Sequence, residues 1–531
     1  MLTRRQFIRC GAVGAGALVV TSAGAGPIVG TNPLTDSPLG RVFGGPDPAF
    51  AAAPGPAFAP ITSLTFTIAD AVKHMVTHGP TNTATCDFWF FKEATMPAAV
   101  PGPQIYATEG DSIPIVVTNT LPHPHAFAIP GIGFGSGPIA PGATWNGTIA
   151  VPTGTAGTYL YYDNLNEPVY RVMGLHGAFI VMPQGAEVPF GWSKYPYNLA
   201  SGHPVKQLYD DFGTAAWWPG LPWHVGDPAG RNPTQPFRQY VWLVHEASSE
   251  LFAEVSNFVP TSGQPVYPAA QFEELFLNDP FIATSTDGRA STPTLDQFNR
   301  KPQFFTINGQ SGHFSHNNAS LTPMNRVGEP SLIRIINAGL YSHSMHIHAN
   351  HVYVTSVDNV VSDNPLWVDV YQLHPMGHMD YTLPYMRPPD VPNSRGIGRG
   401  GSGDPALSSL ANPPFPGFPG AASHPLWPPT EEFTMHHPAI GTLKQGFLGG
   451  TVDIAERQSP LCYPMHSHSE PDQATQGGNY NNSLISGMYF IGDHHDPANP
   501  SDFPIDGDFQ MMLDLGGSTG LTGPAAGKDP M

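Results

Sequence analysis

The sequence predicts an all-β fold with more than one domain. Charged residues make up only 12% of the 531 residues, whereas glycine (58) and proline (60) are abundant. This composition disfavours long amphipathic helices and favours short strands joined by many turns. Apolar runs bounded by turn residues are typical of strands, as in SLTFTIAD, SIPIVVTN, TYLYYDN, GAFIVMP, QYVWLVHE, SLIRIINAG and HVYVTSVD. The length suits two to four ordinary domains better than one compact core.

The strand-like segments form two blocks, which we interpret as domains. The first spans residues 60–185 and the second spans 236–515, and a Trp/Pro/Gly-rich stretch at 186–235 has the composition of an extended connector. An irregular insertion at about 384–430 interrupts the second block. So long a segment usually lies on the surface or over a site, and we interpret it as a lid or an oligomer contact. Residues 516–531 form a tail.

The N-terminal residues have the layout of a twin-arginine export signal. Paired arginines precede an apolar stretch that ends in small residues. The apolar run, roughly 15 residues, is shorter than the ~20 that a membrane-spanning helix needs. We therefore expect residues 1–25 to be a signal and residues 26–59 a flexible lead-in. The mature protein is expected to be periplasmic, cell-surface or extracellular, with no membrane span.

The net charge narrows the class of partner. Its formal value is −19, and a chain this acidic would be repelled by a phosphate backbone. We therefore expect no nucleic-acid partner.

Three His-x-His pairs are the candidate metal ligands. In a strand, residues i and i+2 point to the same face, so each pair presents two imidazoles side by side. Imidazole suits copper, zinc, iron or nickel, and softer sulfur ligands favour copper. A hydrolytic zinc site is a weaker alternative, because no paired general-base carboxylate accompanies the histidines. The pairs are His123 and His125, His346 and His348, and His466 and His468.

The order and surroundings of these pairs resemble the multicopper oxidase superfamily, which is built from cupredoxin β-sandwich domains. PGPQIYATEGDSIPIVVTNTLPHPHAFAIPG resembles the family's segment leading into its first His-x-His, and GTYLYYDNLNEPVYRVMGLHGAFIV resembles the segment carrying its second. HSMHIHANH is similar to the family's His-Pro-x-His-Leu-His region, and YPMHSHSE stands where the family has His-Cys-His. The resemblance is closer to two-domain members than to three-domain laccases. It implies tandem cupredoxin-like Greek-key β-sandwich domains, copper as cofactor and, by analogy, a homotrimer.

The resemblance also assigns the histidines to kinds of copper. His123 and His346 match ligands of the lone type 2 copper, and the other four match ligands of the paired type 3 coppers: His125, His348, His466 and His468. The family site normally has eight histidines, and Tyr162 and Asn164 stand where the missing pair would be. The resemblance therefore implies a reduced copper site.

The type 1 copper site, through which electrons enter in the family, is predicted to be lost. His343 matches one of its ligands and Met488 lies near the place of its axial methionine, but Ser467 and Asp472 stand at the positions of the cysteine and the second histidine. A hydroxyl is a poor substitute for thiolate on this kind of copper. The usual route from substrate through blue copper to the oxygen site is thus interrupted.

Cys462 has two interpretations. Cys10 lies in the signal, so Cys462 and Cys86 remain to form a disulfide in an oxidising compartment. Alternatively, Cys462 and His466 have the Cys-x-x-His to Cys-x4-His type of spacing found in small blue copper proteins. Strand parity argues against the second interpretation, because Cys462 then faces the same way as His466 and away from the side of residue 467. A strand break at Pro464 would void this objection.

The function predicted from the sequence is a secreted copper oxidoreductase that acts on oxygen and an unidentified reductant. The reductant would be a small molecule or a metal ion. One alternative is a non-catalytic copper-binding or cell-envelope cupredoxin protein. The other is a nitrite-reductase-like activity.

Overall fold

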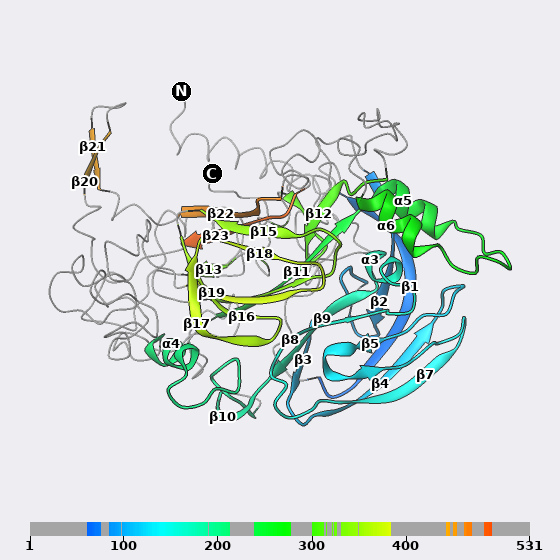
Figure 1. The fold of residues 1–531 in the computed structure, drawn as a ribbon, viewed down its shortest axis with the longest axis horizontal. Helices are drawn as coiled ribbons and strands as arrows, with labels where there is room; N and C mark the ends of the chain where they lie inside the picture. The colour runs from blue at the N-terminus through cyan, green and yellow to red at the C-terminus, as the bar shows by residue number, and fades with distance from the viewer. Residues whose placement is uncertain are drawn as a thin grey trace, which may run out of the picture.

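The computed structural model shows two β-sandwiches side by side (Figure 1). Among the described residues the longest helices have nine residues, and none is long and apolar enough to cross a membrane. The predicted all-β fold of tandem cupredoxin-like domains is confirmed. The structure describes residues 61–75, 84–96, 98–188, 191–212, 238–277, 300–312, 315, 321, 323–325, 331–348, 350–383, 442–445, 450–453, 461–469 and 483–490.

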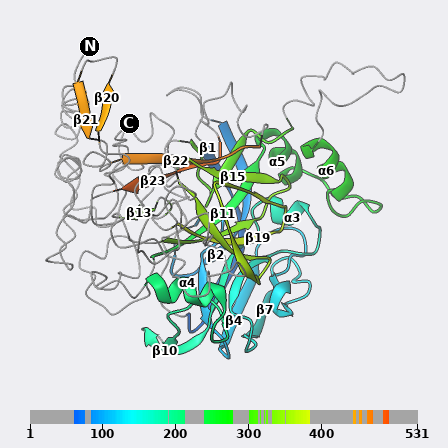
Figure 2. The same cartoon turned by 60° about the vertical axis from the view of Figure 1, so that its left-hand side comes forward.

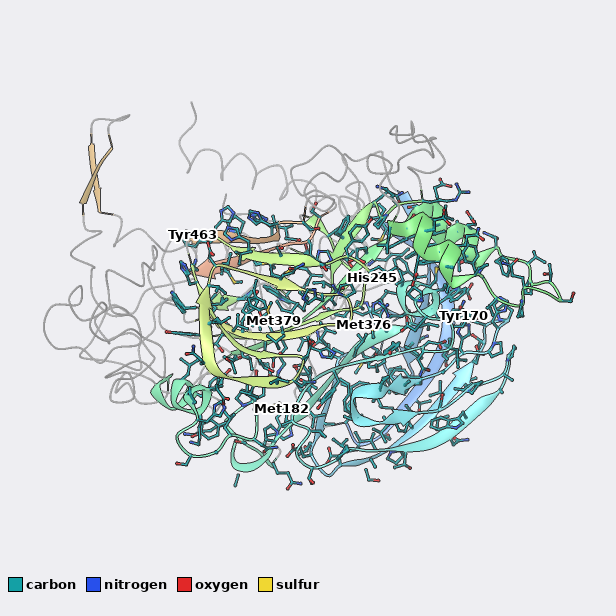
Figure 3. The ribbon with its side chains drawn as sticks, viewed as in Figure 1. Tyr170, Met182, His245, Met376, Met379 and Tyr463 are labelled. Atoms are coloured by element: carbon teal, nitrogen blue, oxygen red, sulfur yellow. The ribbon has the colours of Figure 1, made fainter. Side chains whose placement is uncertain are left out.

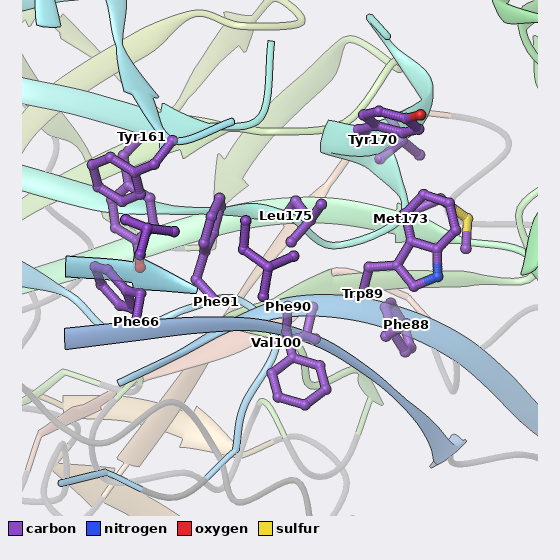
Figure 4. Close-up of a cluster of buried hydrophobic side chains, with 14 of the residues drawn as sticks. Phe66, Phe88, Trp89, Phe90, Phe91, Val100, Tyr161, Tyr170, Met173 and Leu175 are labelled. Atoms are coloured by element: carbon purple, nitrogen blue, oxygen red, sulfur yellow. The ribbon is translucent and has the colours of Figure 1, made fainter. Parts of the chain in front are cut away.

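The first sandwich packs two sheets around an aromatic core. Phe66 stacks on Phe127 at a ring-centroid distance of 5.4 Å, and Phe127 stacks on Tyr161 at 5.1 Å. Figure 4 labels Phe66 and Tyr161 in this core. One sheet has the order β2-β1-β4-β7, formed by Ala84–Glu93, Leu64–Met75, Ser112–Asn119 and Thr144–Ala150. The other has the order β3-β9-β8-β5-β6, formed by Ile105–Thr108, His176–Met182, Gly157–Tyr162, Ala128–Ile129 and Phe134–Gly135.

The second sandwich is built in the same way. Its first sheet has the order β12-β11-β14-β19-β16-β17, formed by Phe304–Ile307, Arg238–Ala247, Ser331–Asn337, His378–Leu383, Val352–Val357 and Val360–Val368. Its second sheet has the order β13-β23-β22-β15-β18, formed by Met324–Asn325, Ile485–Phe490, Leu461–Ser467, His343–Ile347 and Val370–Leu373. Both sheets alternate buried apolar residues with polar ones along several strands, which closes the core between them. Figure 2 shows β22 and β15 at the opposite side of this sandwich from α4.

The two sandwiches are structural repeats of each other. In each, the first strand pairs antiparallel with the next and parallel with a later one: β1 with β2 and β4, and β11 with β12 and β14. Asn119 and Asn337, which end β4 and β14, make the same two bonds. Each amide group donates to the carbonyl four residues on, and each side-chain oxygen accepts from the N–H two residues on.

The register of the paired strands shows which residues of the two sandwiches are equivalent. Ala128 lies opposite Tyr162 in the first sandwich, and His346 lies opposite His466 in the second. The position of His125 is therefore equivalent to that of His343. Tyr162, Asp163 and Asn164 are likewise equivalent to His466, Ser467 and His468.

A buried polar cluster joins the two sandwiches. Arg334 of β14 is 0% exposed and donates to Asp380 of β19 and to Thr158 of β8, each at 2.9 Å. The Asp380 carboxylate also accepts from Tyr197 at 2.7 Å. A buried charge is tolerated when it is paired and hydrogen-bonded, as Arg334 is here, and these bonds connect strands of both sandwiches.

Short helices lie where the sequence indicated strands or an extended connector. The predicted connector, 186–235, begins within β10 (Gln184–Val188) and contains α4 (Pro204–Phe212), which packs against β17. Its buried residues Val205, Leu208 and Tyr209 have the i, i+3, i+4 spacing of a helix face. Two more helices, α5 (Ser249–Ser256) and α6 (Ala269–Leu277), follow β11, and α5 packs on β2 of the other sandwich.

The remaining elements are small. They are η1 (Pro130–Ile132), α3 (Val169–Val172) and a hairpin of β20 (Thr442–Gln445) and β21 (Gly450–Asp453). The predicted signal, the lead-in, the irregular insertion at 384–430 and the C-terminal tail lie outside the described residues.

Candidate metal centre

Two neighbouring strands of the second sandwich carry the candidate metal centre. The strands β15 and β22 pair antiparallel, with His346 directly opposite His466. Past the paired strand ends, the His348 N–H donates to the Pro464 carbonyl at 3.0 Å and the His468 N–H donates to the Ser344 carbonyl at 2.8 Å. The ladder therefore places both His-x-His pairs against each other. In Figure 3, Tyr463 of β22 marks the sheet that carries them.

The four imidazoles converge on one small volume. Ring nitrogens of His346, His466 and His468 all lie within 4.8 Å of one another. His348 joins them, because its Nε2 is 2.9 Å from the Nε2 of His466. The ring centroids of His346 and His468 are 4.6 Å apart, and those of His348 and His466 are 5.0 Å apart. We call these residues, His346, His348, His466 and His468, the four-histidine cluster.

The cluster lies at the surface, and three of its imidazoles, those of His348, His466 and His468, are suited to the neutral form. His466 is 4% exposed, whereas His348 and His468 are exposed. Burial lowers the pKa of His466 to about 4, and the neighbouring histidines lower it too. Burial and neighbouring imidazoles also lower the pKa of His348 and of His468. Neutral imidazole is the form that binds metal, so these shifts favour a ligand role near neutral pH.

Backbone carbonyls orient two of the rings. The Nδ1–H of His346 donates to the carbonyl of Asp369 at 2.9 Å, and the Nδ1–H of His466 donates to the carbonyl of Ser467 at 3.1 Å. Because Nδ1 carries the proton in both rings, Nε2 is the atom that would bind a metal. Protein metal sites commonly orient their imidazoles in this way. A set of four imidazoles without thiolate fits copper, which accepts imidazole nitrogen in open sites.

The first His-x-His pair does not join this cluster among the described residues. His125 is 0% exposed inside the first sandwich, and its Nδ1 is 2.7 Å from a carboxylate oxygen of Asp163. Its ring packs against Tyr170 and Trp89, with centroid distances of 4.5 and 5.4 Å. His123 is partly exposed in the loop after β4. The repeat explains the separation, because His125 is equivalent to His343 rather than to a member of the cluster.

Tyr162 and Asn164 are equivalent to His466 and His468, in line with the missing histidine pair that the sequence resemblance implies. At the equivalents of His346 and His348 the first sandwich has Ala128 and Pro130. The first sandwich thus has no counterpart of the four-histidine cluster among its described residues.

At the position expected for type 1 copper, the polar side chains are hydrogen-bonded to one another. His343 is 0% exposed, with its Nε2 2.6 Å from a carboxylate oxygen of Glu246 and its Nδ1 3.3 Å from the Ser467 hydroxyl. Met488 is also 0% exposed and packs in the apolar core of this sandwich. Asp472 lies outside the described residues. Both nitrogens of His343 are therefore engaged by protein oxygens.

Cys86 and Cys462 are described to different extents. Cys86 is a buried free thiol, 3.2 Å from the Ser249 hydroxyl, so it forms no disulfide with Cys462. Cys462 lies in β22, opposite Tyr489, and the strand runs through Pro464 to Ser467 without a break. The parity objection to Cys462 as a blue-copper ligand therefore stands, while its side chain lies outside the described residues.

Two carboxylates of these sites were missed by the sequence analysis. Glu246 and Asp163 each contact a histidine that is distant in sequence, by 97 and 38 positions respectively. The position of each acidic residue in the sequence could have identified it. Glu246 ends the apolar run QYVWLVHE, and Asp163 follows the apolar run TYLYY. An ionisable group in such a run needs a buried partner.

Comparisons with known proteins agree with this architecture. Two family models, both described as multicopper oxidase, match residues 92–186 and 287–386. No curated protein matches the chain.

Several solved structures are similar over most of the chain. A blue copper oxidase from Nitrosomonas europaea is 16% identical with a TM-score of 0.43, over 85% of this chain and 94% of its own. The multicopper oxidase mgLAC is 14% identical with a TM-score of 0.42, over 84% and 88%. A copper nitrite reductase from Nitrosomonas europaea is 13% identical with a TM-score of 0.38, over 81% and 93%. The two family matches, one in each sandwich-forming half, support a divergent member of the multicopper oxidase superfamily.

Proposed function

We propose that this chain is a copper oxidoreductase whose metal is held by the four-histidine cluster. Dioxygen would be the electron acceptor, and a small molecule or a metal ion would be the reductant. The observation that carries this proposal is the convergence of four imidazoles from two paired strands, within 4.8 Å for three of them and 2.9 Å for the fourth. Four imidazoles gathered at one surface point have no role in packing, and imidazole is a ligand that suits copper.

The surroundings of the cluster support catalysis at the cluster itself. Bound copper would supply one-electron chemistry and an open coordination position for oxygen. His348 and His468 are exposed, so a reductant can reach the cluster directly from solvent. The buried ring of His466 and the carbonyl-bound ring of His346 would hold the geometry.

The hydrogen bonds of His343 also support catalysis at the cluster, because they occupy the position expected for type 1 copper. A type 1 copper would need the Nδ1 of His343 and a thiolate, and the structure has a hydroxyl at 3.3 Å instead. Electrons therefore enter at the cluster rather than through a blue copper relay. We expect copper-dependent turnover without intense blue colour.

The combined variant His346→Ala/His348→Ala tests this function. It removes the two proposed ligands in and just after β15, so we expect loss of bound copper together with loss of oxygen consumption, measured by metal analysis and an oxygen electrode. His374→Ala, which removes an exposed histidine of the loop after β18, should change neither. Oxygen consumption that survives complete copper removal would sink the proposal.

The same assay separates the alternatives. Copper that binds to the wild-type protein and is lost in the variant, without turnover of oxygen in either, would make the chain a copper-binding protein. Turnover with nitrite in place of oxygen would make it a nitrite reductase.

We also propose export by the twin-arginine route, with the protein in the periplasm, at the cell surface or outside the cell. The paired arginines and the short apolar run support it. By analogy with two-domain members of the family we propose a homotrimer. Cell fractionation and light scattering test these two proposals, and retention in the cytoplasm or a monomer mass would contradict them respectively.

A further inference from the structure

A hydrogen-bonded chain crosses the second sandwich and ends beside the four-histidine cluster. It starts at Glu246 of β11 in one sheet and reaches His343 of β15 in the other, with a distance of 2.6 Å between the Glu246 carboxylate and the His343 Nε2. It continues from the Nδ1 of His343 to the hydroxyl of Ser467 in β22 at 3.3 Å. Ser467 lies between the cluster residues His466 and His468 in sequence. The chain therefore ties the strand end that carries two candidate ligands to the opposite sheet.

All donors in this chain can point the same way. The Ser469 N–H donates to the Ser467 hydroxyl at 3.1 Å, and that hydroxyl can donate to the Nδ1 of His343. The Nε2–H of His343 then donates to Glu246, whose other oxygen accepts from the Leu340 N–H at 2.8 Å. Bonds that end on a buried carboxylate are charge-assisted and strengthen one another.

The hydrogen-bonded chain of Glu246, His343 and Ser467 is too buried to act as a site of its own. Glu246, His343 and Ser467 are each 0% exposed. The order of acid, imidazole and hydroxyl matches that of a serine hydrolase, but no substrate reaches a hydroxyl without exposed surface. No nitrogen of His343 is left for a metal, because protein oxygens engage both.

The loop before β15 is shaped around Glu246. A Cβ added at Gly339 would collide with the Glu246 carboxylate, so this loop admits the acid because it has glycine there. Arg171 of the first sandwich donates to the carbonyls of Ala338 and Gly339, so hydrogen bonds from the other sandwich also hold this loop. Glu246 is thus enclosed on several sides.

Comparison of the two sandwiches shows which part of the hydrogen-bonded chain is specific to the second. His125, the equivalent of His343, also contacts the residue equivalent to Ser467, namely Asp163 at 2.7 Å. Its Nε2, however, is buried without a hydrogen-bond partner among the described residues, where His343 has Glu246. The tie through Nε2 to the opposite sheet is therefore found in the sandwich that carries the four imidazoles.

We propose that Glu246, His343 and Ser467 are positioning residues of the four-histidine cluster, a role that rests on the proposed copper function. By fixing the end of β22 they hold the imidazoles of His466 and His468 at the separation that copper needs. A partner that acts through the ligands in this way typically changes metal affinity by 10- to 100-fold when it is removed.

Copper titration of Ser467→Ala tests this role. The variant removes the hydroxyl that contacts the Nδ1 of His343 and accepts from the Ser469 N–H. We therefore expect Cu(II) affinity to fall by about tenfold or more and the Cu(II) hyperfine splitting in electron paramagnetic resonance to change. Ser467→Thr keeps the hydroxyl and should restore both. Ser356→Ala is the matched control: it removes a buried serine, 2% exposed, from the other sheet of the same sandwich. It should leave affinity and spectrum unchanged.

Glu246→Gln is the second variant, which keeps the shape of the side chain and removes its charge. If Ser467→Ala does not fold, the weaker copper binding and altered spectrum are expected in Glu246→Gln instead. Wild-type affinity and spectrum in the folded variants would overturn the positioning role while leaving the proposed function intact. A wild-type protein that binds no copper in the same titration would overturn both.

Discussion

His125 and His343 occupy equivalent positions, and their ring nitrogens decide what each sandwich can hold. In both, Nδ1 directly contacts an oxygen, of Asp163 at 2.7 Å and of Ser467 at 3.3 Å. Hydrogen bonds of this kind leave no room for a metal between the two atoms. The Nε2 of His343 meets Glu246, whereas the Nε2 of His125 is buried without a partner among the described residues. Such an unpaired atom costs on the order of 1–3 kcal/mol.

Cys86 gives a prediction at the scale of a single residue. Burial raises the pKa of its thiol to about 12, and the thiol is enclosed between β1, β2 and α5 beside Ser249. A protonated buried thiol is a poor nucleophile. We therefore expect iodoacetamide to leave Cys86 unmodified in the folded protein and to modify it after unfolding in urea, as read by peptide mass mapping. Modification at equal rates in both states would contradict the buried free thiol.

At the scale of elements, the ladder between β15 and β22 determines the cluster. The pairing puts His346 opposite His466, and the period-two geometry of strands then carries His348 and His468 to the same face. The pairing of β5 with β8 repeats this register with Ala128 and Tyr162. The same backbone arrangement thus carries four imidazoles in the second sandwich and no histidine at the four equivalent positions of the first.

The hairpin between β16 and β17 gives a prediction at this scale. Its turn residues Asp358 and Asn359 have φ values of 49° and 60°, as in a two-residue turn of type I′. The Asn359 side chain accepts from the Thr158 N–H at 2.7 Å and donates to the Thr158 carbonyl at 2.8 Å. Asn359→Gly keeps the turn and loses both bonds, so it should lower the free energy of unfolding by roughly 1–3 kcal/mol.

Asn359→Ala adds a second effect to this change. Alanine also resists a positive φ, so it should be less stable than Asn359→Gly. Urea unfolding curves of the three proteins measure this order. A glycine variant as stable as the wild type would show that the side chain does not join the sandwiches.

At the scale of the whole molecule, the contact between the sandwiches is buried and combines an apolar cluster with hydrogen-bonded polar groups. His176 of β9 and His245 of β11 face each other across it, with ring centroids 4.6 Å apart, and Figure 3 labels His245 at this boundary. Their exposures are 0% and 2%. Burial lowers the pKa of His176 to about 3, and burial and the neighbouring His176 hold the pKa of His245 well below its ordinary value.

These shifts predict how stability depends on pH. Below pH 6.5 the unfolded chain binds protons at both histidines while the folded protein does not, so stability is fully present above about pH 6.5 and falls as pH decreases. The slope is about 1.4 kcal/mol per pH unit for each histidine. Urea unfolding of the metal-free protein at pH 7.5, 6 and 5 measures it. His245→Gln should reduce the slope by one histidine's share, and an unchanged slope in this variant would contradict the neutral buried pair.

The fold and the core of the candidate site were predictable because both follow from local pattern. Strand periodicity predicted the all-β sandwiches, and the i, i+2 spacing predicted that His466 and His468 act together. The resemblance predicted the loss of type 1 copper from Ser467. These inferences needed no knowledge of which strands pair.

The rest depends on contacts between distant parts of the chain. His125 was grouped with the cluster because its motif has the same spacing, but its pairing register puts it inside the first sandwich. The role of Glu246 depends on the packing of one sheet on the other, which no local pattern contains. The helix α4 was missed because its apolar face spans Val205 to Tyr209 within a segment dominated by proline and glycine.

Copper binding at a histidine site without type 1 copper is the central claim, and one measurement tests it most directly. Purified protein is loaded with copper, and metal content, the electron paramagnetic resonance spectrum and the visible spectrum are recorded on the same sample. We expect bound Cu(II) with nitrogen hyperfine structure, wide copper hyperfine splitting and no intense blue band. An intense blue band with narrow hyperfine splitting, or protein that retains no copper, would contradict it.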